Sequence, residues 1–184
     1  YGIRTTNVAD VDDGNTITIS DTGSIETTGD YADGITNIGD KNETTVSGSI
    51  KTDGDDADGI ENYGASNKTT VSGSITTEGN DSHGVNSGPR KFSNISNHST
   101  VVSGSIVTLG LDAFGIYNRG SDNETTVSGS ITTGDVVEST GNFAYGIYNF
   151  GSNNTTTLLE AGSIVTSTGV SSHGIYNEGN GNEN

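Results

Sequence analysis

The chain has 184 residues, only 28% of them hydrophobic, and its seven Lys and Arg face 24 Asp and Glu, giving a net charge of −17. This acidic excess argues against nucleic acid and anionic membrane surfaces as partners, because phosphate binding depends on clustered positive charge. The absence of cysteine excludes disulfides, thiolate metal sites and a cysteine nucleophile, and no apolar run is long enough for a membrane-spanning helix, so we expect no membrane insertion.

Two short signatures alternate along the chain. The first is Gly-Ile-x-Asn, and its copies begin at Gly34, Gly59, Gly115, Gly146 and Gly174, with degraded copies at Gly2 and Gly84. The second is Thr-Thr-Val-Ser-Gly-Ser-Ile, and its close copies end at Ile50, Ile75, Ile106 and Ile131, with looser ones ending at Ile25 and Ile164. From Gly34 to Gly59 to Gly84 the step is 25 residues, and a period of this length predicts a solenoid.

Within each repeat the apolar residues alternate with Thr, Ser and charged residues, a two-residue period that predicts strands rather than helices. One repeat gives strands around Ile35, Val46 and Ile50, separated by turns rich in Gly, Asn and Asp. We therefore predict an all-β fold, a parallel β-helix of about 25 residues per coil and six to seven coils, in a single domain over residues 1–184. Insertions near residues 7–14, 87–97 and 134–140 are expected to form loops.

One aliphatic side chain from each strand is expected to point into the coil and join a continuous core. Three such side chains contribute on the order of 5–9 kcal/mol by burial. Ordering the backbone of about 25 residues costs some tens of kcal/mol, so no coil is stable without its neighbours. The predicted core consists of Ile25, Ile35, Val46, Ile50, Ile60, Val71, Ile75, Val102, Ile106, Ile116, Val127, Ile131, Ile147, Leu158, Ile164 and Ile175.

An asparagine follows the first-signature Ile by two residues and therefore points to the same inward side. Stacked Asn side chains can bond to one another and to the turn backbone, as amide ladders do in cross-β assemblies. We interpret these residues as a structural ladder, with ligand binding as the alternative. They are Asn37, Asn62, Asn118, Asn149 and Asn177.

Tyr117, Tyr148 and Tyr176 occupy one equivalent outward position in the last three coils. Such a strip can stack against sugar rings or a partner protein. The simpler interpretation, which we prefer, is an aromatic ladder that stabilises its own sheet. His83 and His173 share another position, where other coils have Asp, Phe or Tyr, and this variability suggests a tolerant corner rather than a metal site.

Acidic residues gather in Gly-rich turns, where carboxylate and carbonyl oxygens can surround Ca²⁺. The candidate ligands are Asp10, Asp12, Asp53 and Asp55. Neither group matches the spacing of an EF-hand or of the Gly-Gly-x-Gly-x-Asp nonapeptide, so solvated turn carboxylates are the preferred interpretation. We expect no cofactor, with Ca²⁺ as the alternative.

Several Asn-x-Ser/Thr sequons are possible glycosylation sites, and five of them are expected to share one repeat position. They are Asn42, Asn67, Asn97, Asn123 and Asn154. Copying of the repeat explains them more simply than selection for glycans. The segment 89–92 combines the only Pro with two basic residues and is expected to be a protruding linker or a contact loop.

The alternation of Gly-Ile-Tyr-Asn-x-Gly-Ser-x-Asn-x-Thr-Thr with Val-Ser-Gly-Ser-Ile-x-Thr, as between Gly115 and Thr133, resembles repeats of bacterial autotransporter passengers and haemagglutinin-like adhesins. The resemblance implies a secreted, right-handed β-helix at the cell surface, acting as a stalk or an adhesive surface. The expected partners are neighbouring repeats of a longer chain or copies of the chain end to end, and surface glycans or host and cell-surface proteins. The chain opens and closes within repeats, which favours a processed subunit or a piece of a longer array.

We therefore expect a non-catalytic extracellular structural and adhesive element. The alternative is a self-assembling filament subunit that stacks coil on coil. A minor alternative is a polysaccharide-binding or lyase-like β-helix, which would gather carboxylates and a basic residue on one face. The sequence disfavours an enzyme because its basic residues Arg4, Lys41, Lys51, Lys68 and Arg119 fall on different coils.

Overall fold

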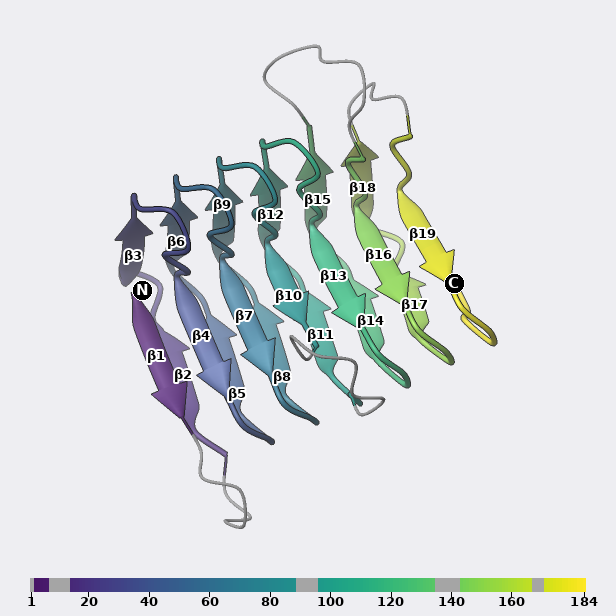
Figure 1. The fold of residues 1–184 in the computed structure, drawn as a ribbon, viewed down its shortest axis with the longest axis horizontal. Coiled ribbons are helices and arrows are strands. Elements are labelled where there is room, and N and C mark those ends of the chain that lie inside the picture. The colour runs from purple at the N-terminus through teal and green to yellow at the C-terminus, as the bar shows by residue number, and fades with distance from the viewer. Residues whose placement is uncertain (1, 7–13, 89–95, 135–142, 167–170) are drawn as a thin grey trace.

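The structure is a computed structural model that describes residues 2–6, 14–88, 96–134, 143–166 and 171–184. Within these ranges the chain forms 19 short strands and no helix, so the described part contains no helix that could cross a membrane. The strands stack as successive parallel coils along one axis (Figure 1). This confirms the all-β solenoid that the repeat predicts. The expected insertions fall largely on residues 7–13, 89–95 and 135–142, outside the described part.

The strands belong to three parallel sheets; each of six coils contributes one strand to each sheet, and β19 adds a seventh strand to the first sheet. The first sheet consists of β1 (Ile3–Thr6), β4 (Ile35–Ile38), β7 (Ile60–Tyr63), β10 (Val85–Ser87), β13 (Ile116–Arg119), β16 (Ile147–Phe150) and β19 (Ile175–Glu178). The second sheet consists of β2 (Thr16–Ile19), β5 (Glu43–Val46), β8 (Lys68–Val71), β11 (Ser99–Val102), β14 (Glu124–Val127) and β17 (Thr155–Leu158). The third consists of β3 (Ser24–Thr27), β6 (Ser49–Thr52), β9 (Ser74–Thr77), β12 (Ser105–Thr108), β15 (Ser130–Thr133) and β18 (Ser163–Thr166).

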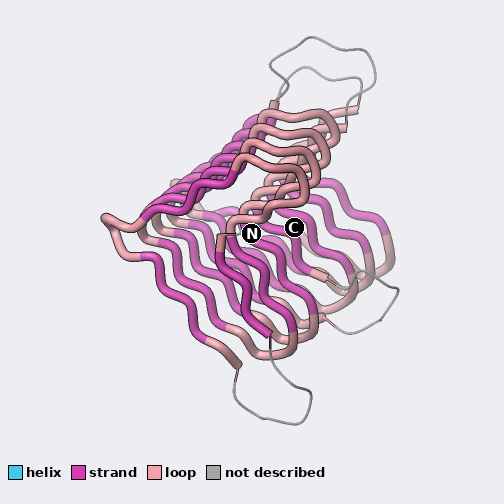
Figure 2. The backbone as a smooth tube through the Cα atoms, turned by 60° about the vertical axis from the view of Figure 1, so that its left-hand side comes forward, coloured by secondary structure: helices cyan, strands magenta, loops and turns pink. Residues whose placement is uncertain are grey.

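These seven, six and six strands agree closely with the six to seven coils that the sequence predicts. Successive coils follow the same path, so the strands line up in files along the stack (Figure 2). The pairing is in register throughout the described strands; in the degraded repeat, for example, Val85 pairs with both Ile60 and Ile116. Residues at one position of the repeat therefore lie directly over one another.

The core is a file of aliphatic side chains inside the stack. In the middle coils the predicted core residues are at most 1% exposed, as Ile35, Val46 and Ile50 illustrate. Ile25, Ile164 and Ile175 pack against this core but are only partly buried, because they belong to the outermost strands. Leu158 corrects the prediction: it pairs with Val127, yet its side chain is 46% exposed. The reason is that β17 is the last strand of the second sheet, and no described strand covers it.

The glycine that opens the first signature marks a close approach between coils. A Cβ atom added to Gly115 would lie 2.3 Å from Cγ2 of Ile131 and 2.6 Å from the carbonyl oxygen of Gly146. Real Cβ contacts are longer than this, and the equivalent glycines before the other strands from β1 to β16 are equally crowded, so these turns have no room for a side chain. Only at Gly174, before β19, is the nearest atom 3.8 Å away. The signature therefore begins with Gly for a steric reason.

Candidate functional site

The outer side of the first sheet carries two files of side chains that are aromatic in the later coils. We call them the strand file, which is Arg4, Thr36, Glu61, Asn86, Tyr117, Tyr148 and Tyr176, and the turn file, which is Asp33, Asp58, His83, Phe114, Tyr145 and His173. Each turn-file residue stands two positions before the Ile or Val that begins a strand of this sheet.

The rings of both files stack along the axis. In the strand file Tyr117 and Tyr148 have ring centres 5.0 Å apart and planes within 4° of each other. In the turn file, His83 and Phe114 stack in the same way, with ring centres 4.7 Å apart and planes within 5° of each other. The two files also meet edge to face, with Phe114 and Tyr117 at 5.3 Å and 83°. Such pairs each add about 0.5–1.5 kcal/mol beyond area burial.

Because Tyr117, Tyr148 and Tyr176 pack against one another, their ring faces are largely occupied. The ring of His83 is likewise stacked, on that of Phe114.

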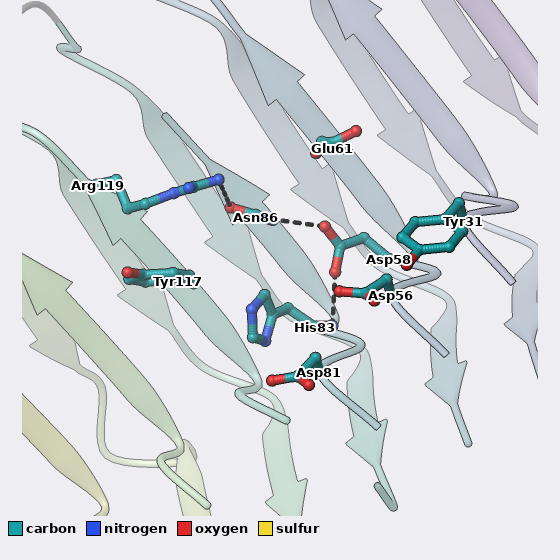
Figure 3. Close-up of a pocket in the computed structure, with 9 residues that line it drawn as sticks. All are labelled: Tyr31, Asp56, Asp58, Glu61, Asp81, His83, Asn86, Tyr117 and Arg119. Atoms are coloured by element: carbon teal, nitrogen blue, oxygen red, sulfur yellow. Dashed lines mark hydrogen bonds between the residues drawn. The ribbon is translucent and has the colours of Figure 1, made fainter. Parts of the chain in front are cut away.

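Toward the earlier coils the same two files become polar, and their side chains form a hydrogen-bonded chain (Figure 3). Asp58, only 5% exposed, accepts hydrogen bonds from the backbone N–H of His83 and from Nδ2 of Asn86, both at 2.7 Å. Oδ1 of Asn86 in turn accepts a hydrogen bond from Nη2 of Arg119 at 3.0 Å. The guanidinium of Arg119 also lies 5.0 Å from the ring centre of Tyr117. An amide thus links a guanidinium to a buried carboxyl group.

Burial is the largest cause of the pKa shifts of Asp58 and His83. It raises the pKa of Asp58 well above its usual range, with the charge of Glu61 as the next cause, and the hydrogen bonds from His83 and Asn86 oppose the rise. Burial also lowers the pKa of His83 to about 3, and the charge of Arg119 acts in the same direction. His83 is therefore neutral at pH 7, and its Nδ1 accepts a hydrogen bond from the backbone N–H of Phe114 at 3.1 Å.

A cavity of about 350 Å³ lies where the aromatic and acidic halves meet, and we call it the acidic pocket. Turn residues and strand residues of four coils line it together (Figure 3). The lining residues are Tyr31, Asp56, Asp58, Glu61, Asp81, His83, Asn86, Tyr117 and Arg119. Tyr31 is 66% exposed, and Tyr31, Asp56 and Asp81 share a turn position with φ between 51° and 57°.

The acidic pocket brings one basic residue and several acidic residues together on one face, although the basic residues of the chain fall on different coils. Arg119 and the carboxyl groups of Asp58 and Glu61 belong to different coils, yet they line one cavity because it runs along the stack. The sequence contains a signal for this site: the two file positions change together from polar to aromatic residues along the repeats. This signal appears only when equivalent positions of successive repeats are compared.

The predicted inward Asn residues form a hydrogen-bonded ladder. Nδ2 of Asn37 donates to Oδ1 of Asn62 at 2.8 Å, and Asn118, Asn149 and Asn177 repeat this contact at 2.8 Å. The same Nδ2 groups donate to threonine hydroxyls of the second sheet, such as Asn37 to Thr44 at 2.9 Å, where turn backbone was the expected partner. Ser87 takes the place of Asn in β10.

The sequon asparagines form a second ladder, which corrects the expectation of possible glycosylation. Asn42, Asn67, Asn123 and Asn154 are at most 1% exposed, and the side chains of successive members hydrogen-bond, as Asn42 does to Asn67 at 3.0 Å. A glycan has no room at a buried amide. Asn97 does not share their position: it is exposed, and His98 occupies the ladder position instead, donating its backbone N–H to Asn123.

The two Ca²⁺ candidates that the structure describes, Asp53 and Asp55, each have a partner within the protein. Asp53 pairs with Lys51 at 2.8 Å, and Oδ1 of Asp55 accepts the backbone N–H of Asn80 at 2.8 Å, a contact that ties one turn to the next. Among the residues that the structure describes, no group of three or more His, Asp or Glu is arranged to hold a metal ion. Asp10, Asp12 and the segment 89–92 lie outside the described residues.

Comparison with known proteins gives no relative: no family model, no curated protein and no solved structure matches this chain.

Proposed function

We propose that the protein is a non-catalytic extracellular structural and adhesive element, a surface stalk or fibre segment whose first sheet carries the contact surface. The observation that carries this proposal is the in-register pairing of all three sheets, from β1 to β19 in the first. Parallel strands at about 4.8 Å spacing make a stiff frame whose outer side chains repeat in every coil. Such a frame presents extended surfaces, and its repeat style is similar to that of bacterial autotransporter passengers and haemagglutinin-like adhesins.

Bead adhesion tests the adhesive role. Beads coated with the chain are perfused over epithelial cells and over bacterial cells, each untreated, treated with periodate to destroy glycans, or treated with protease to strip proteins. We expect retention above that of albumin-coated beads, with one of the two treatments removing it. Retention no greater than that of albumin-coated beads on any surface would overturn the adhesive role.

A second candidate function is end-to-end assembly into a filament, and the last strands favour it. Leu158, Leu159 and Val165 are 46–57% exposed at that end of the stack. There β17 and β18 each pair with only one neighbouring strand among those described, and Glu183 bonds only to the start of β17, at Asn154 and Thr156, which leaves the end of that strand open. An open edge with apolar groups is a template for a further strand. The fitting partner is the first coil of a second copy, and negative-stain microscopy of the isolated chain distinguishes filaments from single rods.

The enzymatic alternative has one favourable observation, the meeting of Arg119 with carboxyl groups in the acidic pocket. A lyase acting on uronate polymers requires a positive site, whereas this pocket holds four acidic residues and one arginine. The oxygens of Asp58 accept two hydrogen bonds, and its side chain is nearly inaccessible. Assays for reducing ends and for unsaturated uronates on neutral and acidic polysaccharides test this alternative, and we expect no turnover above that of the Glu61→Gln variant.

A further inference from the structure

Four of the chain's seven tyrosines lie together on the outer side of the first sheet, in its last three strands and the turn before one of them (Figure 1). Tyr117, Tyr148 and Tyr176 lie over one another because β13, β16 and β19 pair in register. Tyr145 joins them from the turn file. Neighbouring ring centres in this group are 4.9–5.4 Å apart. The four phenol rings are therefore close enough to react with one another.

Tyr117 and Tyr148 have the relative orientation that favours coupling. Their ring centres are 5.0 Å apart and their planes lie within 4° of each other. The unpaired electron of an oxidised phenol occupies the π system, which extends perpendicular to the ring, so nearly parallel rings present to each other the orbitals that form a bond. The rings of Tyr148 and Tyr176 are tilted by 50°. Tyr145 is only 7% exposed, whereas Tyr117 and Tyr148 are half-buried and more accessible to an oxidant.

A carboxylate lies in position to accept the phenol proton of Tyr148. The hydroxyl group of Tyr148 donates a hydrogen bond of 2.6 Å to Oε2 of Glu178, on β19. Burial, together with this hydrogen bond, raises the pKa of Tyr148, so the phenol keeps its proton at neutral pH. Loss of an electron alone would leave a positively charged ring, whereas simultaneous transfer of the proton to Glu178 leaves a neutral radical. The hydrogen bond therefore makes Tyr148 easier to oxidise.

The stack gains most from a covalent bond between coils because it has no other means of making one through its side chains. The chain contains no cysteine, so no disulfide joins one coil to the next. A bond between Tyr117 and Tyr148 would connect β13 directly to β16 and close the intervening stretch of chain into a loop. Closing a loop in the unfolded chain reduces its conformational entropy and so stabilises the folded state.

We propose that Tyr117 and Tyr148 form an oxidative cross-linking site, at which a haem peroxidase supplied with hydrogen peroxide joins the two rings into dityrosine. The peroxidase removes one electron from each ring, while the phenol proton of Tyr148 passes to Glu178 and that of Tyr117 to water. The two radicals form a bond between ring carbons next to the hydroxyl groups. The hydrogens of these carbons then move as protons to the phenol oxygens, which restores both aromatic rings.

The reaction balances: two tyrosines and one hydrogen peroxide give one dityrosine and two water molecules. The peroxide receives the two electrons and two protons that the tyrosines lose. This modification is independent of the adhesive function proposed above.

Peptide mapping tests the proposal. The dilute chain is treated with a haem peroxidase and hydrogen peroxide, unfolded and digested with trypsin, which cleaves after Lys91 and Arg119. A bond between Tyr117 and Tyr148 joins the peptides 92–119 and 120–184. We expect mass spectrometry to find this joined pair in monomeric chains, lighter than the two peptides by two hydrogen atoms, together with dityrosine fluorescence.

Three results would overturn the proposal. The first is the absence of dityrosine, and the second is dityrosine confined to covalent dimers. The third is a bond confined to the peptide 120–184, because such a bond joins Tyr145, Tyr148 and Tyr176 among themselves and leaves Tyr117 out.

Matched variants assign the role of each residue. Tyr117→Phe and Tyr148→Phe keep the ring and should each abolish the joined pair. Tyr31→Phe removes an exposed tyrosine outside the group and should leave its yield unchanged. Glu178→Gln keeps an acceptor but is a far weaker base, so it should slow formation of the joined pair at least about tenfold. Equal rates for Glu178→Gln and the parent chain would contradict the role of the carboxylate.

The cross-link should also stabilise the stack. We expect the midpoint of thermal melting of the cross-linked chain to rise by about 5–10 °C. Tyr117→Phe treated with the same oxidant is the control, since it retains every other oxidation product. Thermal melts before treatment establish that each variant is folded, and the two Phe variants test the same bond independently. An unchanged midpoint in a chain that carries the bond would contradict its stabilising role.

Discussion

His98 interrupts an otherwise repeated ladder of asparagines. Its neighbours in the ladder, Asn67 and Asn123, lie in adjacent coils, and His98 donates its backbone N–H to Asn123 as an asparagine would. Its ring, however, offers no amide oxygen, and Nδ2 of Asn67 is left without a hydrogen-bond partner although it is buried. A buried donor without a partner costs about 1–3 kcal/mol.

The change His98→Asn should therefore stabilise the protein, by about 1 kcal/mol, because it restores an acceptor for Asn67. Urea unfolding at pH 7 measures the effect. Asn123→Ala serves as the opposite control, since it removes an existing contact with Asn154 and should destabilise the protein. A neutral or destabilising His98→Asn would mean that the packing of the imidazole outweighs the missing hydrogen bond.

The same substitution should change the response to acid. Burial lowers the pKa of His98 from 6.5 to about 4, although the backbone carbonyls of Asn67 and Gly64 favour the charged form. A histidine with a lowered pKa contributes stability that is present above pH 6.5 and is lost as the pH falls toward 4. The loss of stability between these two pH values should be smaller in His98→Asn than in the parent chain.

Asp58 changes the pH dependence of stability in the opposite direction to His98. Burial and the charge of Glu61 raise its pKa above 3.8, so its contribution to stability is full below that pH and is lost as the pH rises through the raised value. Glu61→Gln removes the nearest negative charge and keeps an acceptor for Tyr63. We expect this variant to be more stable than the parent at pH 8 and nearly equal to it at pH 4, by urea unfolding at both. A constant difference across this range would exclude coupling between the two carboxyl groups.

At the scale of the turn, the glycine that opens each strand of the first sheet allows a matched comparison. A Cβ at Gly115 would meet Ile131 and the backbone of Gly146, whereas a Cβ at Gly174, in the last coil, would approach no atom closer than 3.8 Å. Gly115→Ala should therefore cost several kcal/mol, on the order of 3, and Gly174→Ala less than about 1. Thermal melting and hydrogen exchange measure both. Equal losses would indicate that backbone entropy rather than contact between coils determines the effect.

The sequence predicts the strands well, and it does so for a physical reason. Burial alternates along most strands of the second and third sheets, as in Thr44 and Val46 facing inward while Glu43 and Thr45 face outward. In the first sheet, β4, β7 and β10 are buried at successive positions instead. The sequence does not predict the exposure of Leu158, because a residue's burial depends on whether a neighbouring coil covers it. It also does not predict the acidic pocket, since Tyr31 and Arg119 meet only after the coils stack.

At the scale of the whole molecule, the contacts between coils hold the stack together against the repulsion that a large net charge causes. Cross-coil contacts such as that of Lys68 with Glu43 at 2.9 Å neutralise a few carboxylates, but both partners are exposed and the pair contributes at most about 1 kcal/mol. The charge of −17 therefore repels a second copy at low salt. Salt at about 0.15 M reduces the range of this repulsion to about 8 Å, while contacts between strand edges remain.

End-to-end assembly should consequently be favoured by salt and depend on the exposed edge of the last strands. Leu158→Lys places a charge on that edge, where Leu158 is 46% exposed, and should raise the protein concentration needed for assembly about tenfold. Thr45→Lys adds the same charge to the outward side of β5, a strand of the second sheet that is paired on both sides, and should leave assembly close to that of the parent. Sedimentation across a concentration series, with rod lengths from negative-stain images, measures both variants. Single rods at every concentration and salt level, or lateral rafts that Leu158→Lys does not affect, would contradict stacking through these edges.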